Sequence, residues 1–516
     1  MNKIVGSLQN LPEELILDNL FRLSIDDINE LCRSNKKIKS VCDKNKEYIY
    51  RKLLERDFMI KLAPDSKNAK LLYNSLITFS NELPVDYIVD ENPDFMLLNS
   101  KLHPDVIFDI INDSEPKLVK KLLVANPDII DLVDKDKNTL LHYILKSNII
   151  EQSKLIMINE LLDINQKKVL NMLDSLNKDN QTALILFSKH IRDQINTLIK
   201  FISQSKNINQ QDKDGNTALI YYLKSPNPAE LVYLEFIKRK ADITLVNKKG
   251  NTAFTYAIKS GNYTIIRDLF DKYFKNHLNH KNTKGEIYLH KAAKYFQVDA
   301  IELLLSKDSS LVNEQNYEKN TPLHAVSWQD SDLLETIPVN AILNTYESLI
   351  INGGDLNIQN KTGITPFMNF VSHFNSIDKV TFRNILNIMI ENRANFDLKD
   401  ENGYNILHYF FTNVPTDYDT FEFLDNLEEL LAKLLDKHIY SLDKEGNTAL
   451  FWLMKKIYSN RKTEDPNNIE LDEFFNQILL IFKENNYDFS KKDRKGRTIK
   501  TFLLSNLDNF NLESLN

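Results

Sequence analysis

One pattern recurs along most of the chain, and it limits the possible folds more than any other feature. An Asp or Asn leads through a Gly-like position into Thr and an apolar run, as in DKDGNTALIYYL from Asp212 and DKEGNTALFWLM from Asp443. The successive starts lie 43, 35, 35, 35, 34, 44, 40, 43 and 50 residues apart. The copies start at Asp134, Asn177, Asp212, Asn247, Asn282, Asn316, Asn360, Asp400, Asp443 and Asp493. This period predicts a repeat array in which each unit contacts mainly its neighbours.

The residue types of one unit predict a turn followed by two helices. Asp, Asn and Gly suit a tight turn, because Gly adopts a positive φ without steric cost. Thr can cap the next helix, and Pro322 and Pro366 stand where a first helical turn tolerates proline. Apolar residues recur at helical spacing later in the unit, as in VDAIELLLSK from Val298. One helix pair cannot bury its own apolar face, so the units must stack.

This pattern resembles the ankyrin repeat, whose signature is T-P-L-H-x-A. The copy TPLHAV from Thr321 matches it best, and LHKAA from Leu289 keeps the second half. The resemblance implies an all-α fold with an ankyrin-repeat α-solenoid over residues 103–516, the array, with about ten to eleven degenerate repeats. The signature positions are Thr139, His142, Thr182, Gly215, Thr217, Gly250, Thr252, Gly285, His290, Thr321, Pro322, His324, Gly363, Thr365, Gly403, His408, Gly446, Thr448 and Gly496.

Several units depart from this signature. The turn glycine is replaced by Lys137, Asn180 and Lys319, and the capping Thr by Ile287 and Asn405. The repeated histidine, at His142, His290, His324 and His408, is expected to bond to the backbone of a neighbouring turn, as in the family. The larger spacings predict longer helices or insertions, mostly between the two helices of a unit. The charged turn tips are expected to be solvated, with some open to a partner: Lys135, Lys213, Lys248, Lys249, Glu401, Glu445 and Arg494.

A compact, leucine-rich segment precedes the array. Asn10 and Glu13 predict a capping box around Pro12, and the apolar residues that follow predict a short helix. Ser24 with Asp27 predicts a second cap, and helical spacing continues to Phe58. Surplus apolar surface on so small a module is typical of a partner-binding domain. We call residues 8–58 the head; residues 59–102 are expected to form a helical linker.

The head resembles an F-box. The family's opening Leu-Pro and following Glu-Leu match Leu11, Pro12, Glu14 and Leu15, while its terminal Leu-Trp appears as Ile49-Tyr50. The resemblance implies docking onto the Skp-type adaptor of a cullin-RING ubiquitin ligase. The expected contact residues are Leu11, Pro12, Leu15, Leu20 and Ile28. A helical cap that shields the first repeat is the alternative, although a true cap should abut the repeat it protects.

Together the two resemblances predict a substrate-recognition adaptor that links a target protein, bound by the array, to a Skp-cullin-F-box ubiquitin ligase. F-box proteins with ankyrin arrays are similar in layout and composition, and they occur in giant DNA viruses and intracellular bacteria. The rival interpretation is an ankyrin scaffold or decoy that binds a protein without recruiting a ligase. No nucleotide-binding, metalloprotease or hydrolase motif occurs in the sequence, so we expect no enzyme activity and no cofactor or metal.

Composition excludes several other classes of function. The net charge of −7, with both signs interleaved, gives little support to nucleic-acid binding. No apolar run is long enough to cross a bilayer, so a membrane partner is not expected. The only cysteines, Cys32 and Cys42, are expected to be neither disulfide-bonded nor zinc ligands, which fits a reducing compartment. These features predict a cytoplasmic protein of a eukaryotic host cell, with nuclear entry left open.

Overall fold

The computed structural model describes residues 12–21, 23, 25–34, 36–58, 127–147, 150–191, 194–326, 339–372, 379–411, 421–434, 436–461 and 469–506. The chain divides into two compact units, Met1–Asn247 and Lys248–Asn516. Among the described residues the secondary structure is helical, apart from two isolated bridges, Val133–Thr139 and Leu442–Thr448. The predicted all-α class is therefore confirmed. The linker 59–102 and most of the predicted leading unit 103–133 lie outside the described residues.

The head contains four short helices around a small apolar core. They are α2 (Glu13–Leu20), α3 (Ile25–Ser34), α4 (Lys36–Lys44) and α5 (Lys46–Phe58). α4 packs against α2, α3 and α5. The buried side chains come from all four helices: Ile16, Leu17, Leu20, Ile28, Leu31, Ile38, Val41, Cys42, Ile49, Tyr50 and Leu53. Such burial is the main contribution that holds a domain of this size together.

The start of α2 differs from the predicted capping box. The N-cap position is Pro12, and Glu13 does not turn back towards its own helix. Its carboxylate instead accepts a hydrogen bond from Asn45 Nδ2 at 2.7 Å and pairs with Lys44 Nζ at 3.1 Å. The bond from Asn45 and then that from Lys44 lower the pKa of Glu13. The capping-box prediction was wrong for Glu13, because two donors at the end of α4 compete for its carboxylate.

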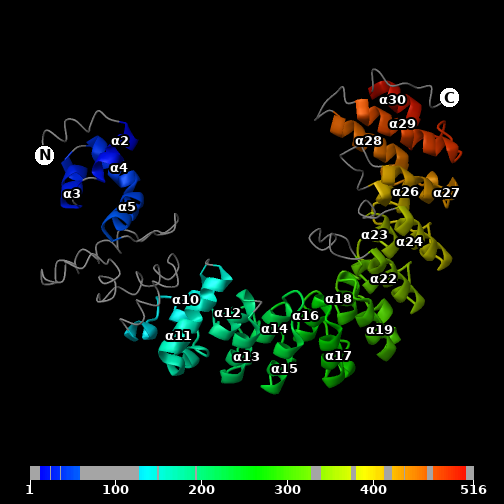
Figure 1. Ribbon diagram of the computed structural model, residues 1–516. Helices are drawn as coiled ribbons and strands as arrows, with labels where there is room; N and C mark the ends of the chain where they lie inside the picture. The colour runs from blue at the N-terminus through cyan, green and yellow to red at the C-terminus, as the bar shows by residue number, and fades with distance from the viewer. Residues whose placement is uncertain are drawn as a thin grey trace, which may run out of the picture. The chain divides into compact units, whose positions relative to one another are not determined.

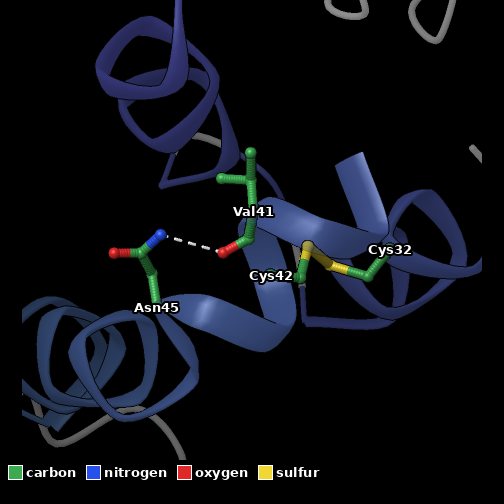
Figure 2. Close-up of a disulfide and its surroundings, with 4 residues drawn as sticks. All are labelled: Cys32, Val41, Cys42 and Asn45. Atoms are coloured by element: carbon green, nitrogen blue, oxygen red, sulfur yellow. Dashed lines mark hydrogen bonds between the residues drawn. A yellow bond between two sulfur atoms is a disulfide. The ribbon is translucent and has the colours of Figure 1, made fainter. Parts of the chain in front are cut away.

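The two cysteines of the head are joined by a disulfide, contrary to the sequence-based expectation. Cys32 near the end of α3 and Cys42 in α4 lie with their Cα atoms 5.9 Å apart. Figure 2 shows this disulfide beside Val41, whose carbonyl accepts a hydrogen bond of 2.9 Å from Asn45 Nδ2. The spacing of ten residues suggested no known motif. The packing of α3 on α4 nevertheless brings the two Cα atoms within the usual range for a disulfide.

The first unit also holds the first three described repeats. Each is a helix pair: α10 (Leu140–Lys146) with α11 (Glu151–Met172), α12 (Ala183–His190) with α13 (Ile195–Gln204), and α14 (Ala218–Leu223) with α15 (Glu230–Lys238). A short 3-10 helix, η2 (Pro127–Asp131), precedes them. First helices α10, α12 and α14 pack side by side in chain order, and so do second helices α13 and α15 (Figure 1). The predicted nearest-neighbour stacking is present here.

The second unit continues the same arrangement. Its first helices are α16 (Ala253–Ser260), α18 (Tyr288–Lys294), α20 (Pro322–Ala325), α23 (Pro366–Val371), α25 (Ile406–Phe410), α28 (Ala449–Arg461) and α30 (Ile499–Asn506). Its second helices are α17 (Tyr263–Lys272), α19 (Val298–Lys307), α22 (Val339–Ile351), α24 (Lys379–Glu391), α26 (Phe421–Leu431) and α29 (Ile469–Glu484). Short helices η3 (Phe274–Asn276), η4 (Ser309–Asn313) and α27 (Asp436–Ile439) precede three of the turns. Each second helix packs on the next, from α17 to α29.

The long spacings have two structural origins. In the first described repeat, α11 runs over 22 residues and is interrupted at Asn165, whose side chain accepts from Lys168 N at 3.1 Å. This longer second helix accounts for the extra length. In the four later long repeats, the residues between first and second helix include 327–338, 373–378, 412–420 and 462–468, which lie outside the described residues. The sequence segments QDSDLLETIPVN and SNRKTEDPNNIE fall largely there.

Candidate protein-binding face of the repeat array

The turn of each repeat is closed by its first side chain. In the turn that begins at Asp212, Oδ1 accepts from the backbone N–H groups of Asp214 at 3.0 Å and Asn216 at 2.9 Å. The N–H of Gly215 donates to the carbonyl of Asp212 at 2.9 Å. The turns at Asn282, Asn316, Asn360 and Asp400 repeat this pattern. Only an acceptor side chain of Asp or Asn length can satisfy both donors, which explains the first position of the motif.

The fourth position of these turns requires a left-handed backbone. The signature glycines Gly215, Gly250, Gly285, Gly363, Gly403, Gly446 and Gly496 all have φ between 71° and 84°. Where the sequence departs from glycine, Lys137, Asn180 and Lys319 adopt the same conformation, with φ of 61°, 55° and 58°. The turn geometry is therefore kept in the degenerate repeats, at a conformational cost that glycine avoids.

Helix caps and histidines fix each first helix to its turn. The hydroxyls of Thr182, Thr217, Thr252, Thr365 and Thr448 accept from the backbone N–H three residues on, and Asn405 does the same with its amide oxygen. Thr139 and Thr321 instead contact the Nδ1 atoms of His142 and His324, at 2.7 Å and 2.9 Å. Pro322 and Pro366 occupy the first helical turn. Ile287, which replaces Thr, supplies no capping oxygen.

Three of the four repeated histidines also bridge to the following repeat. The Nε2 atoms of His142, His290 and His324 lie 3.0, 2.9 and 3.0 Å from the carbonyls of Gln181, Asn320 and Ile364. His408 Nδ1 contacts Asn405 Oδ1 at 2.6 Å. All four imidazoles are buried, and burial lowers the pKa of each. Their contacts assign these side chains to repeat stacking rather than to chemistry on a ligand.

Successive turns are joined edge to edge. The second residue of a turn donates its N–H to a carbonyl of the preceding turn: Lys213 to Asp179 at 2.9 Å, Lys361 to Glu318 at 3.0 Å and Glu401 to Thr362 at 3.0 Å. Side chains reinforce some of these contacts, because Lys178, Lys213 and Lys361 pair with Asp136, Asp179 and Glu318 at 2.9, 3.0 and 3.2 Å. Lys213, one of the turn-tip residues expected to be solvated, is thus paired with a carboxylate of the preceding turn.

Replacement of a turn glycine is expected to loosen this edge. In Gly363→Ala, the new Cβ would lie 2.8 Å from Asp400 Cα at a φ of 84°. Gly353→Ala is the matched control, since its φ is 91° but nothing lies within 4 Å of a Cβ there. We expect Gly353→Ala to cost about 1–2 kcal/mol and Gly363→Ala at least about 1 kcal/mol more in urea unfolding. If the two variants lose the same free energy of unfolding, the close contact between adjacent turns does not contribute to stability.

Aromatic side chains of the first helices also hydrogen-bond to the turns that precede those helices. Tyr221 Oη donates to Asp212 Oδ2 at 2.7 Å, and Tyr409 Oη donates to Asp400 Oδ2 at 2.9 Å. Burial, followed by the neighbouring carboxylate, raises the pKa of both phenols. Trp452 Nε1 donates to Tyr404 Oη at 3.1 Å in the same way. These bonds hold the first helices against the turns through aromatic and charged side chains, and Tyr and Trp are residue types enriched in protein interfaces.

In the head, the expected contact residues divide into two groups. Pro12 and Leu15 are exposed, Leu15 with 48% of its surface. Leu20 and Ile28, with 0% and 3%, belong to the core and are closed to a partner in this conformation. Leu11 lies outside the described residues. Tyr48, which is not among the contact residues expected from the sequence, is 45% exposed and packs edge-on against Phe21.

Comparison with known families identifies the repeats. One model of ankyrin repeats, in three copies, matches residues 188–282, and a second model of ankyrin repeats matches residues 289–336. The chain therefore carries ankyrin repeats, which are protein-interaction modules. Both matches lie inside the array, and neither covers the head. No curated protein matches the chain.

Two further observations describe what this part of the chain holds. Among the described residues, no group of three or more His, Cys, Asp or Glu side chains is arranged to bind a metal ion. Nor does any helix there combine the length and apolar character needed to cross a membrane.

Proposed function

We propose that this chain is a substrate-recognition adaptor of a Skp-cullin-F-box ubiquitin ligase. Its head would bind the Skp-type adaptor, and its array would hold the target protein near the ubiquitin-loaded enzyme. The chain then supplies proximity, which raises the effective concentration of the target, and the partner enzymes perform the chemistry. Such a role would place it where the ligase works, in the cytoplasm of a eukaryotic host cell. Because Cys32 and Cys42 form a disulfide, this location rests on the proposed role and no longer on the cysteines.

The observation that carries the proposal is the exposure of Pro12 and Leu15 on a head with a closed core. The core of the head is already filled by residues such as Leu20 and Ile28, so these outer apolar side chains contribute little to folding. They match the opening of the F-box motif, which begins with Leu11. Exposed apolar side chains on a small helical module favour a protein partner. The ankyrin repeats of the array provide the second binding module.

The test is recovery of a Skp-type adaptor by the full-length chain and by a Pro12→Ala/Leu15→Ala variant. Burial of one apolar side chain contributes roughly 1.5–3 kcal/mol, so the double variant should lose on the order of 3 kcal/mol, or about a hundredfold in affinity. The fold should persist, because both positions are exposed.

Lys39→Ala is the control, since Lys39 is an exposed polar residue of α4. It should recover as much adaptor as the unaltered chain. If the unaltered chain recovers none, or if the double variant recovers as much, the head is not a working F-box. The chain would then act as an ankyrin scaffold or decoy.

A further inference from the structure

The first helices of five consecutive repeats carry a lysine at the same register, at or next to their C-terminal residue. Counting seven residues from the capping position, Thr139, Thr182, Thr217, Thr252 and Ile287 lead to Lys146, Lys189, Lys224, Lys259 and Lys294. The first three, which we call the lysine row, belong to the unit Met1–Asn247 and close the adjacent helices α10, α12 and α14 (Figure 1). This register brings one positive charge per repeat to one edge of that helix layer.

Contacts place two members of the row, Lys189 and Lys224, close together. Lys189 Nζ lies 5.4 Å from the ring centroid of Tyr221, and Lys224 Nζ lies 4.6 Å from the same centroid. These two distances limit the separation of the ammonium nitrogens to 10 Å. Lys224 Nζ also donates to Asn216 Oδ1 at 3.1 Å, which holds it over the ring. A ring that contacts both cations lowers the cost of keeping them near each other.

The carboxylates near this edge already have partners: Asp212 accepts from Tyr221 Oη, and Asp136 pairs with Lys178. Lys146 and Lys189 are exposed and form no ion pair within the described part of the chain. Lys154, at the start of α11, is buried and donates from Nζ to the carbonyl of Leu145 at 3.0 Å, with Glu151 as the acidic group nearest to it in sequence. Desolvation, and then the charges of Lys189, Lys154 and Lys146, lower the pKa of His190. Lys146 and Lys189 therefore both lie near enough to His190 to act on its charge.

A helix dipole favours lysine in any last turn, but it does not explain this row. At the same register, seven residues after Thr365 and Thr498, the first helices α23 and α30 of the second unit are followed by or contain Ser372 and Ser505 in place of lysine. The dipole also does not select one register in five successive repeats. On a chain with a net charge of −7, two exposed lysines without an ion pair in the described part of the chain, Lys146 and Lys189, mark a surface for a negatively charged ligand.

We propose that the lysine row binds an acidic, extended segment of the target protein, with Asp or Glu at every third residue. Packed helices lie about 8–10 Å apart, and three residues of extended chain span about 10 Å, so successive carboxylates would meet successive lysines. A nucleic-acid backbone fits less well, because a chain with a net charge of −7 offers few further cations to neutralise a run of phosphates. The inference deepens the proposed function by naming the class of target, and it rests on target binding by the array.

The experiment measures fluorescence anisotropy with the full-length chain and a labelled peptide of four Asp-Ser-Gly units, below about 0.1 M salt, where screening is weaker. We expect Lys146→Glu/Lys189→Glu to weaken binding by at least about tenfold, and the salt dependence to fall with it. The control is Lys200→Glu/Lys206→Glu, which makes the same charge change at exposed lysines on and after α13. It should change affinity less than about twofold, as expected for charges outside the contact.

Several outcomes would overturn the proposal. These are no binding of the peptide, equal binding of an Asn-Ser-Gly peptide, an equal loss in the control variant, and tighter binding of an oligothymidine of matched charge. Failure of the head to recover a Skp-type adaptor would leave the peptide result unchanged. The two proposals can therefore fail separately.

Discussion

Acidification from pH 7.5 to pH 5.0 is expected to destabilise the unit Lys248–Asn516 by about 4 kcal/mol through two buried histidines, each contributing about 2 kcal/mol. His324 and His408 expose 6% and 0% of their surface, and burial lowers the pKa of each to about 4. For His408, burial outweighs the opposing charge of Asp443. The loss should be largest between pH 6.5 and pH 4.

The sign follows from proton binding in the two states. In the unfolded chain a histidine takes up a proton near pH 6.5, whereas the folded chain does so only near pH 4. Between these values the unfolded state binds more protons, so stability falls as the pH falls. The bonds of His324 agree with a neutral ring: Nδ1 accepts from Thr321 N at 3.1 Å, while Nε2 faces the carbonyl of Ile364 and must carry the proton.

Tryptophan fluorescence in urea provides the measurement. Both tryptophans of the chain, Trp328 and Trp452, lie in this unit, and Trp452 hydrogen-bonds to Tyr404, which stacks on His408. In His324→Gln/His408→Gln, the difference between pH 7.5 and pH 5.0 should shrink by most of the 4 kcal/mol. The exposed His277→Gln should leave it unchanged. An undiminished pH dependence in the double variant would assign the acid sensitivity to other groups.

The stacking of the array could be predicted from the sequence because it rests on a repeated local pattern. The period, the turn residues and the cap recur often enough to survive substitution. Lys137, Asn180 and Lys319 show why, since each takes up the conformation that glycine would have. The turn–turn hydrogen bonds were not visible in the sequence, because they use backbone groups that every residue carries.

The details of the head could not be derived in the same way, because they depend on contacts between residues distant in sequence. Glu13 meets Lys44 and Asn45 only after α2 has packed against α4. The burial of Leu20 and Ile28 likewise follows from three-dimensional packing, and helical spacing alone does not separate core from docking surface. The lysine row was present in the sequence as a register, but single lysines appear unremarkable until the first helices lie side by side.

Leu304→Ala is expected to lower the stability of the second unit by about 2–5 kcal/mol, through lost burial and a residual cavity. Leu304, in α19, is 1% exposed, and α19 packs against α17, α18 and α22. Leu480→Ala, which removes the same atoms from a side chain that is 48% exposed in α29, is the control and should cost about 0.5 kcal/mol or less. The same fluorescence measurement compares the two variants.

The position of Leu304 makes this result informative about cooperativity as well as packing. In a stack of repeats, stability is the sum of intrinsic terms and nearest-neighbour interfaces, and α19 contributes to the interfaces on both of its sides. Weakening both interfaces should uncouple the repeats on either side of α19, so that a single urea transition becomes two. Trp452 lies in α28, several repeats beyond the change, and reports the unfolding of the distant repeats. A single transition shifted to lower urea would instead mean that the repeats from α16 to α30 unfold as one unit. A loss equal to that of Leu480→Ala would contradict the placement of Leu304 in the core.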